Sequence, residues 1–497
     1  MSENATKLCH ILVFLPSRNV YSGGEEKRLV SLCAEAGKNL ITEKKSREEK
    51  QMTVREQLDQ WFDQHWEEQL RDLQHMVRIP SVARYDDPQT PYGPECLNVL
   101  QEMLRIGGAY GFRTENIADR VGSLSMGSAS PENEIGIWCH LDVVPAGAGW
   151  QHTSPFVPKQ VDDYLIGRGA DDNKGPAIGV MYVLRALKEL NIQTRHNMKL
   201  FVGTDEEHGM QDVQYFSRHF PADKLSIIAD CGFPVCYGEK GIITFDFISK
   251  NRMETVTGVR AGVASNIIPA EAEMTIAGNR LEGHGTQGHS AFPEGSVNAI
   301  RDLLTCAVQS GDLSDNDRKT IAFFAGIQDD WGQALGMAGE DEISGRTSAV
   351  PVMMFLTDEG RLALRINART CISCDHQAVL QVLRELAEEN NCTLENIETK
   401  PSSYFPKENP VVQALTEACN ETTGLDLQPY VMAGGTYCKY LQKAIGYGFG
   451  GLPRPKSDLF AQGHGGAHQP DEGLYLPNYR KAMTVFAMGL LAADQVL

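Results

Sequence analysis

Apolar residues recur at three- and four-residue steps after Met52, which predicts an amphipathic helix that ends before Pro80. Similar patterns predict helices over 95–112, 176–190, 211–219, 410–423 and 478–495. Short apolar runs predict buried strands near 121–126, 135–141, 198–203, 225–229, 428–432 and 445–449. This alternation of strands and helices predicts an α/β fold with a mostly parallel sheet flanked by helices.

Residues 242–403 have a different texture and predict a second, α+β domain inserted into the first. β-branched and alternating residues predict strands at 242–248, 254–259, 272–276 and 362–367. Helices are predicted at 296–309 and 376–390. The α/β domain is therefore expected in two parts, 52–241 and 404–497. Residues 1–51 match neither domain, and we interpret them as an accessory extension or as the product of an upstream start site.

Composition narrows the class of protein. The 497 residues hold 65 acidic and 46 basic side chains, a net charge of −19, which argues against binding to nucleic acid or to anionic membrane surfaces. The 12 cysteines show no regular spacing, which favours reduced thiols and a cytoplasmic location. No apolar run reaches the roughly 18 residues that a membrane-spanning helix needs.

The predicted strand at 135–141 ends in His140-Leu-Asp142, the first candidate for chemistry. Alternation along a strand places His140 and Asp142 on the same face. There the aspartate can accept a hydrogen bond from one imidazole nitrogen while the other nitrogen binds a metal ion. Taken alone, the pair is more often a histidine satisfied by a neighbouring carboxylate.

Four further segments place carboxylates or histidines after predicted strands. Each one alone could be a capping loop or a solvated turn. Their candidate ligands and acids are Asp172, Glu206, Glu207, Asp230 and His468. The ends of parallel strands meet at one edge of a sheet, so we expect these side chains to lie together. Mixed nitrogen and oxygen donors suit Zn²⁺, with Mn²⁺ as the alternative, and the set is large enough for a two-metal hydrolytic centre.

The order of these motifs resembles the M20 family of metallopeptidases over about residues 55–497. The motifs are HxD, GRGAxDxK, DEE, a lone Asp and a late GAHxPxE loop. The segments Cys139–Pro145, Gly175-Pro176 and Ala433–Thr436 most resemble the bacterial dipeptidase branch, which is PepV-like and Sapep-like. The family implies a catalytic α/β domain and an inserted lid domain.

The resemblance also implies a role for each motif residue. One metal ion would be held by His140, Asp172 and Asp230, and the second by Asp172, Glu207 and His468. Asp172 would bridge the two ions and precede a cis peptide bond, with Asp171 as a neighbour. Glu206 resembles the general base, and Asp142 the acid that orients His140. We interpret His464 as a loop residue, and His208 has no assigned role.

The inserted domain carries the residues that resemble the family's substrate contacts. His289 resembles the lid histidine, which would stabilise the oxyanion. Asn266 resembles a substrate-contacting asparagine. Arg369 resembles the arginine that grips a carboxylate, with Arg365 as a rival. The loop of Gly434, Gly435 and Thr436 should help to hold the C-terminal carboxylate of a short peptide.

These interpretations together predict a metallo-dipeptidase with two divalent metal ions per chain. The first alternative is an N-acyl amino acid deacylase of the same fold, such as a desuccinylase or deacetylase. An inactive metal-binding homologue and a carboxypeptidase for longer peptides are the others. The long insertion predicts a monomer, because a second lobe could occupy the surface through which smaller members of the family dimerise.

Overall fold

The computed structural model describes residues 52–497, and the predictions about residues 1–51 lie outside this range. Leu58–Leu497 form one compact unit. The first described helix, α3, spans Val54–Val77 and ends before Pro80, as predicted. No helix in the described range is long and apolar enough to cross a membrane. The described cysteines are free thiols.

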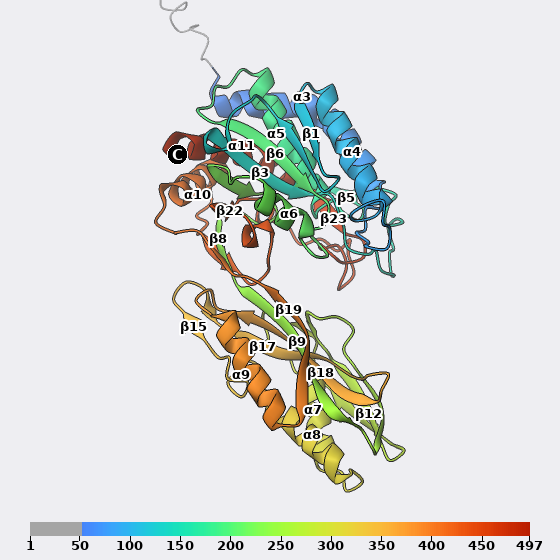
Figure 1. The fold of residues 1–497 in the computed structure, drawn as a ribbon. Helices are drawn as coiled ribbons and strands as arrows, with labels where there is room; N and C mark the ends of the chain where they lie inside the picture. The colour runs from blue at the N-terminus through green and yellow to red at the C-terminus, as the bar shows by residue number, and fades with distance from the viewer. Residues whose placement is uncertain (1–51) are drawn as a thin grey trace, which may run out of the picture. The chain divides into compact units, whose positions relative to one another are not determined.

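A mixed sheet of nine strands forms the centre of the α/β part (Figure 1). Its strands follow the order β1 (Arg113–Ile117), β2 (Val121–Ser125), β6 (Asn197–Gly203), β3 (Glu134–His140), β7 (Leu225–Ile228), β22 (Ala444–Gly446), β8 (Cys236–Glu239) and β20 (Ser403–Tyr404), and β21 (Tyr430–Met432) pairs with β8. The four strands β6, β3, β7 and β22 run parallel, and antiparallel strands lie on either side of them.

Amphipathic helices cover this sheet and bury its apolar strands. They are α4 (Pro94–Ala109), α5 (Lys174–Glu189), α6 (Gln211–His219), α10 (Pro410–Thr423) and α11 (Leu476–Val496), together with α3. Helix α5 is buried along nearly its whole length because it packs between the sheet and α11. A small sheet beside them contains β23 (Gly473–Tyr475), β5 (Tyr164–Ile166) and β4 (Lys159–Val161). The short helices η1 (Pro131–Asn133) and η2 (Tyr437–Lys439) lie in loops.

A second, antiparallel sheet is formed by the chain between the two parts of the mixed sheet. Its order is β13 (Asn279–His284), β12 (Glu271–Ile276), β10 (Val256–Ala261), β17 (Ser348–Leu356), β18 (Arg361–Thr370), β9 (Gly241–Arg252) and β19 (Cys392–Lys400). One face packs against α7 (Ala299–Val308), α8 (Asp315–Gly326) and α9 (His376–Glu389) (Figure 1). Two small two-stranded sheets pair β11 (Ile267–Ile268) with β14 (Gly288–His289) and β15 (Glu340–Asp341) with β16 (Gly345–Arg346).

The predicted fold class is confirmed: a mostly parallel α/β sheet is interrupted in sequence by an antiparallel α+β insertion. We call the part built on the antiparallel sheet, β9 to β19, the lid. The boundaries at 241/242 and 403/404 stay predictions. Strands β3, β6 and β7 are parallel neighbours, so their carboxyl ends bring His140, the turn after Gly203 and Asp230 to one edge of the sheet.

Candidate metal centre

His140 ends the buried strand β3, and its ring is held from both sides. Its exposed fraction is 1%. The backbone oxygen of Asp142 lies 3.0 Å from its Nδ1 atom, and the Asp142 carboxylate lies 3.5 Å from the same atom. Nε2 is then the nitrogen that faces the carboxylates beyond it. The predicted pairing therefore exists, with the closer contact made by the backbone oxygen of Asp142.

The Asp142 carboxylate has a second set of partners at the end of β6. It accepts hydrogen bonds from the backbone nitrogens of Glu206, at 3.1 Å, and Glu207, at 3.0 Å. One buried aspartate thus fixes the backbone of the DEE segment relative to His140. Because only the backbone nitrogens of Glu206 and Glu207 make these contacts, the two side chains remain available to the site.

Asp172 lies between the two predicted histidine ligands. Its Oδ1 atom is 3.1 Å from Nε2 of His140, and its Oδ2 atom is 3.1 Å from Nε2 of His468. The predicted cis peptide bond between Asp172 and Asn173 is present. A carboxylate that offers one oxygen to each of two histidine-containing groups has the geometry of a bridging ligand. Asp171, the neighbouring carboxylate, makes neither contact.

The turn that carries Asp172 is held by Glu472, to which the sequence analysis gave no role. One carboxylate oxygen of Glu472 accepts hydrogen bonds of 3.0–3.1 Å from the backbone nitrogens of Gly169, Asp171 and Asp172. The other oxygen is 2.6 Å from the Arg168 guanidinium. Both Glu472 and Arg168 are buried. Glu472 is the final residue of the GAHxPxE motif, so the motif could have marked its position but could not show its partners.

Asp230 lies just after the end of β7. Its Oδ2 atom is 3.7 Å from Nε2 of His140. The amide of Asn173 donates a hydrogen bond of 2.9 Å to Asp230 Oδ1, and Asn173 Oδ1 accepts one of 3.3 Å from the backbone nitrogen of His140. Asn173, also without an assigned role, therefore connects two predicted ligands of the same ion.

His468 reaches the site from a glycine-rich loop near the end of the chain. Its Nε2 atom is 2.9 Å from Glu207 Oε1, and its side chain is 50% exposed. The loop is fixed by Asp471, whose carboxylate accepts hydrogen bonds from the backbone nitrogens of Gln151 and His152 and lies 2.8 Å from His464 Nδ1. His464 thus pairs within the loop, whereas His468 points to the carboxylates.

Glu206 is almost fully buried, and its Oε1 atom has no hydrogen-bond partner in the described structure. Its neighbour Asp205 points away from the site. The Asp205 carboxylate accepts a hydrogen bond from the Tyr85 hydroxyl, and Asp212 accepts from the backbone nitrogens of Thr204 and Asp205. These contacts fix the turn on the side that faces away from the site. They leave Glu206 as the buried carboxylate that lacks a full set of partners.

His208 packs against Tyr85, with ring centroids 4.6 Å apart and an edge-to-face angle of 90°. This contact accounts for an aromatic side chain directly after the DEE motif. It places His208 on the outside of the turn, beside Tyr85 and not among the predicted ligands.

The electrostatics of the centre reflect an excess of buried carboxylates. Burial alone would lower the pKa of His140, but Asp230, Asp142 and Asp172 raise it well above its ordinary value. Hydrogen bonds with Asp172 and Glu207 raise the pKa of His468 to about 11. Burial raises the pKa of Asp230 to about 7. The centre therefore binds positive charge strongly, whether as protons on histidines or as metal cations.

Two overlapping groups of side chains have the spacing of cation ligands. In one group, ligand atoms of His140, Glu206 and Asp230 lie within 4.8 Å of one another, and in the other those of His140, Asp172 and Glu207 do. His468 joins the second group through its contacts of 2.9 and 3.1 Å. Imidazole nitrogens and carboxylate oxygens, with no thiolate among them, are donors that suit Zn²⁺ or Mn²⁺. The residues fit a centre for two ions.

Arg369 and Arg365 lie on the same face of β18 but have different partners. Arg365 makes two hydrogen bonds, of 2.7 and 2.8 Å, with the buried carboxylate of Asp246. Arg369 donates to the carbonyl oxygen of Ala433 at 3.0 Å and to Asn367. Arg369 has no carboxylate partner in the described structure, and it reaches the Gly434–Thr436 loop. Of the two arginines, Arg369 is therefore the one whose charge is not paired with a described carboxylate.

The Gly434–Thr436 loop is anchored through its last residue. The backbone nitrogen and hydroxyl of Thr436 both donate to the buried carboxylate of Glu239, the hydroxyl at 2.6 Å. The side chain of Lys439 fills the space beside Gly435, where an added Cβ would lie 2.0 Å from its Cε atom. The loop therefore lies between Arg369 and the end of β8.

The two remaining predicted residues, His289 and Asn266, are exposed and lie near each other on the lid. Ile267, the residue after Asn266, pairs with His289 between β11 and β14. The Nδ1 atom of His289 accepts a hydrogen bond of 3.1 Å from the backbone nitrogen of Ala291. No described contact joins either side chain to the carboxylate–histidine cluster, so the structure does not bring them together with the predicted ligands.

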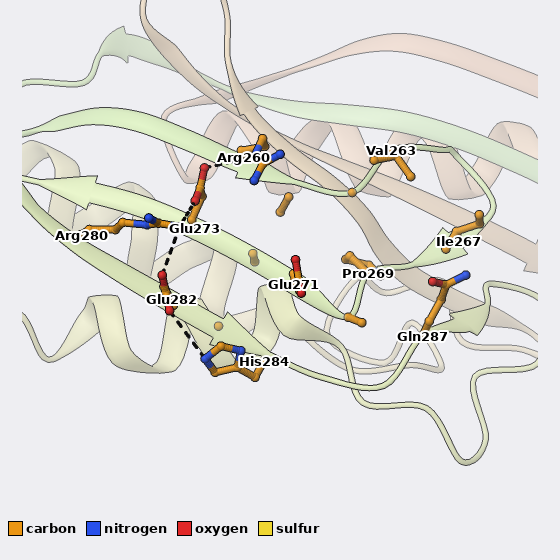
Figure 2. Close-up of a pocket in the computed structure, with 15 residues that line it drawn as sticks. Arg260, Val263, Ile267, Pro269, Glu271, Glu273, Arg280, Glu282, His284 and Gln287 are labelled. Carbon is orange, nitrogen blue, oxygen red and sulfur yellow. Dashed lines mark hydrogen bonds and ion pairs between the residues drawn. The ribbon is translucent and has the colours of Figure 1, made fainter. Parts of the chain in front are cut away.

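A hollow of about 620 Å³ lies elsewhere, on the open face of β10, β12 and β13 (Figure 2). Its charged side chains pair with each other. Glu273 contacts Arg260 at 3.1 Å and Arg280 at 2.6 Å, and Glu282 contacts Arg280 at 3.1 Å. The hollow contains none of the predicted site residues, and its charges need no ligand for compensation.

Comparisons with known proteins identify the family of this chain. The family model described as "Peptidase family M20/M25/M40" matches residues 136–491. A Staphylococcus saprophyticus protein, provisionally named a dipeptidase, is 28% identical over 422 residues, which cover 76% of this chain and 89% of the relative.

Two solved structures show the same fold. Human carnosine dipeptidase 1 has a TM-score of 0.59 at 16% identity, and the dipeptidase Dug1p from Saccharomyces cerevisiae has a TM-score of 0.60 at 13% identity. Each match covers 89% of this chain and 99% of the other. The family predicted from the motifs is confirmed: this chain belongs to peptidase family M20/M25/M40.

Proposed function

We propose that this protein hydrolyses the amide bond of dipeptides or very short peptides and that it uses two divalent metal ions. The observation that carries the proposal is the position of Asp172, with one oxygen 3.1 Å from His140 and the other 3.1 Å from His468. The ligands would be His140, Asp172 and Asp230 for one ion, and Asp172, Glu207 and His468 for the other. Bound there, the ions would polarise the scissile carbonyl group and lower the pKa of a water molecule.

Glu206 is the residue of this chain best placed to move protons. Burial and the nearby charge of Asp230 raise its pKa well above the ordinary value for a glutamate. A carboxylate with a raised pKa can accept a proton from water and then release it to the amine near neutral pH. Glu206 would take the proton as the water oxygen bonds to the carbonyl carbon, and it would give the proton to the nitrogen as the C–N bond breaks.

His289 would stabilise the negative charge that develops on the carbonyl oxygen. Its Nδ1 atom accepts a hydrogen bond from Ala291, so the proton of the neutral ring is on Nε2. Partial desolvation of the ring, and to a smaller extent the charge of Arg369, lower the pKa of His289, which favours this neutral form. An Nε2–H group facing a developing oxyanion is a suitable hydrogen-bond donor. This role requires the lid to close over the bound substrate.

Substrate length would be limited on the carboxyl side. The guanidinium of Arg369 has no carboxylate partner in the described structure, and it lies against the Gly434–Thr436 loop. A free C-terminal carboxylate would satisfy it by charge-assisted hydrogen bonds. Asn266 on the lid is proposed as a further substrate contact. A peptide with several residues beyond the scissile bond would have to displace these contacts.

The proposal is tested by an activity panel with protein from which metals have been removed and then restored as Zn²⁺ or Mn²⁺. The substrates are Ala-Ala, Ala-Ala-Ala, N-acetyl-alanine and N-succinyl-alanine. We expect Ala-Ala to have the highest kcat/KM and the metal-free protein to be inactive. Faster hydrolysis of either acylated amino acid would instead identify a deacylase. A metal-loaded protein that cleaves none of the four would contradict the proposal.

A further inference from the structure

Two cationic side chains of the lid lie in one cross-strand row where the lid joins the mixed sheet. Ile242 on β9 pairs with Arg369 on β18 and with Lys400 on β19. Residues paired directly across neighbouring strands project from the same face of the sheet. Arg369 and Lys400 therefore project on the same side, with their strands about 10 Å apart.

This row lies against the loop that was predicted to hold substrate. Arg369 donates to the carbonyl oxygen of Ala433, directly before Gly434. Lys439, three residues after Thr436, donates to the backbone oxygens of Lys240 at 2.6 Å and Pro401 at 2.9 Å. Pro401 follows Lys400, and Lys240 precedes β9. The chain passes between the mixed sheet and the lid twice, near Lys240 and near Pro401. Lys439 binds both segments, so both are held to the segment that begins at Ala433.

The positive charges at this junction exceed the negative ones. Burial lowers the pKa of Lys439 to about 8; Glu239 opposes this shift and the charges of Arg369 and Lys400 add to it, so the three cations influence one another. The nearby carboxylate, Glu239, lies 3.7 Å from Lys439 and already accepts two hydrogen bonds from Thr436. Two carboxylates, Glu239 and the buried Glu206, therefore face three cations, since Glu206 also feels the charge of Lys400.

Lys400 has no ion pair and no side-chain hydrogen bond among the described contacts, although it is partly buried. The hollow in Figure 2 shows the contrast, because Arg260 and Arg280 there contact carboxylates at 2.6–3.1 Å. One C-terminal carboxylate would satisfy Arg369 and leave Lys400 without an anion in direct contact. A partly desolvated ammonium group without a partner is costly, and a second anionic group of the ligand would compensate it.

We propose that Lys400 binds a side-chain carboxylate on the C-terminal residue of the substrate, so that the enzyme prefers dipeptides ending in glutamate or aspartate. Arg369 holds the terminal carboxylate of the same residue. The long, flexible side chain of Lys400 and the Arg369 guanidinium can converge on two carboxylates of one amino acid. This inference rests on the proposed dipeptidase function and specifies its substrate class.

The first test compares Ala-Glu with Ala-Gln, which differ in charge but hardly in shape. We expect kcat/KM of the metal-loaded enzyme to be about 10- to 100-fold higher for Ala-Glu, the range that one hydrogen bond to a charged group supplies. Lys400→Met should reduce the Ala-Glu to Ala-Gln ratio to near one, and Lys400→Arg should restore most of it. Lys250→Met is the matched control, because Lys250 is on β9 and pairs with the exposed Glu388, and it should leave the ratio unchanged.

A ratio near one in the unmodified enzyme, or a ratio that Lys400→Met leaves unchanged, would overturn the inference. The second of these results would show that Lys400 affects all substrates equally through its charge. If Ala-Ala, Ala-Glu and Ala-Gln are all left intact, the dipeptidase function itself fails. In that case, calorimetric binding of glutamate and glutamine to the metal-loaded protein still tests the subsite. Equal affinity for both amino acids would exclude it.

Discussion

The backbone nitrogen of Asp172 donates a hydrogen bond of 3.1 Å to the buried carboxylate of Glu472, 300 residues later in the chain. This contact joins the two parts of the chain that supply the candidate metal centre. The loop of His468 and the turn of Asp172 are positioned together, because the Glu472 carboxylate holds the turn and the same loop carries the histidine.

We predict that Glu472→Gln weakens metal binding without removing a ligand. The substitution keeps the size of the side chain but loses the charge that pairs with Arg168. Loss of a residue that orients a ligand typically costs about 10- to 100-fold in metal affinity. Metal titration followed by calorimetry measures the change. Glu421→Gln, on the exposed face of α10, is the control, and equal affinity in the two variants would contradict the role of Glu472.

Glu206→Gln tests the assignment of the general base. Glutamine keeps the shape of the side chain but cannot accept the proton, so we expect kcat for Ala-Ala to fall by roughly 10²- to 10⁴-fold or more. Metal content should stay at two ions per chain, because Glu206 is not a ligand in the proposed set. Turnover close to that of the unmodified enzyme would assign the base to another residue.

The motif residues were predictable from sequence because they follow apolar strands directly. Residues that work through backbone contacts were not. Glu472 and Asp212 act by accepting backbone hydrogen bonds, and no fixed spacing marks such contacts. The choice between Arg365 and Arg369 was also open, because the two lie four residues apart on one strand and share a face. Asp246 on the neighbouring strand distinguishes them by binding Arg365.

Most helices and central strands followed from periodicity, and three of the elements that were not predicted have local causes. Helix α8 opens with a charged run and ends in an apolar one, so it has no regular apolar stripe. Strand β17 contains Pro351 and a register shift after it, which hides its pattern. Strand β19 lies at the sheet edge and is polar along much of its length, so it resembles a loop in sequence.

The pH dependence of stability can be tested at Asp223, outside the candidate centre. Burial, and to a smaller extent Glu134, raise its pKa to about 7 from the ordinary value of 3.8. An acid whose pKa is higher in the folded state favours folding below about pH 4 and loses this contribution as the pH rises to 7. Asp223→Asn should therefore increase the free energy of unfolding at pH 8 by roughly 1–4 kcal/mol. The thermal unfolding midpoint at that pH should rise accordingly. At pH 4 the advantage should disappear.

The control for this measurement is Asp358→Asn, at an exposed position of the lid. Its unfolding midpoint should follow that of the unmodified protein at both pH values. An Asp223→Asn protein whose midpoint differs from the unmodified one by the same amount at pH 4 and pH 8 would rule out titration of this carboxyl group as the cause.

We predict that the enzyme works as a monomer and that His289 acts on the metal centre of its own chain. The reason is the length of the insertion, residues 242–403, which leaves room for a lobe at the surface where smaller relatives would pair. Light scattering should give the mass of one chain, 54.8 kDa. Mixing inactive His289→Ala and Glu206→Ala chains should restore no activity. Recovery of activity on mixing would show that the histidine acts across an interface.

The central claim, a two-metal centre bridged by Asp172, is tested most directly by counting bound ions. Non-denaturing mass spectrometry of the zinc-reconstituted protein should show two ions per chain. Removing the bridge by Asp172→Ala should leave neither ion tightly bound, whereas Asp171→Ala, the matched control at the adjacent carboxylate, should retain both. Two tightly bound ions in the Asp172→Ala protein would contradict the account.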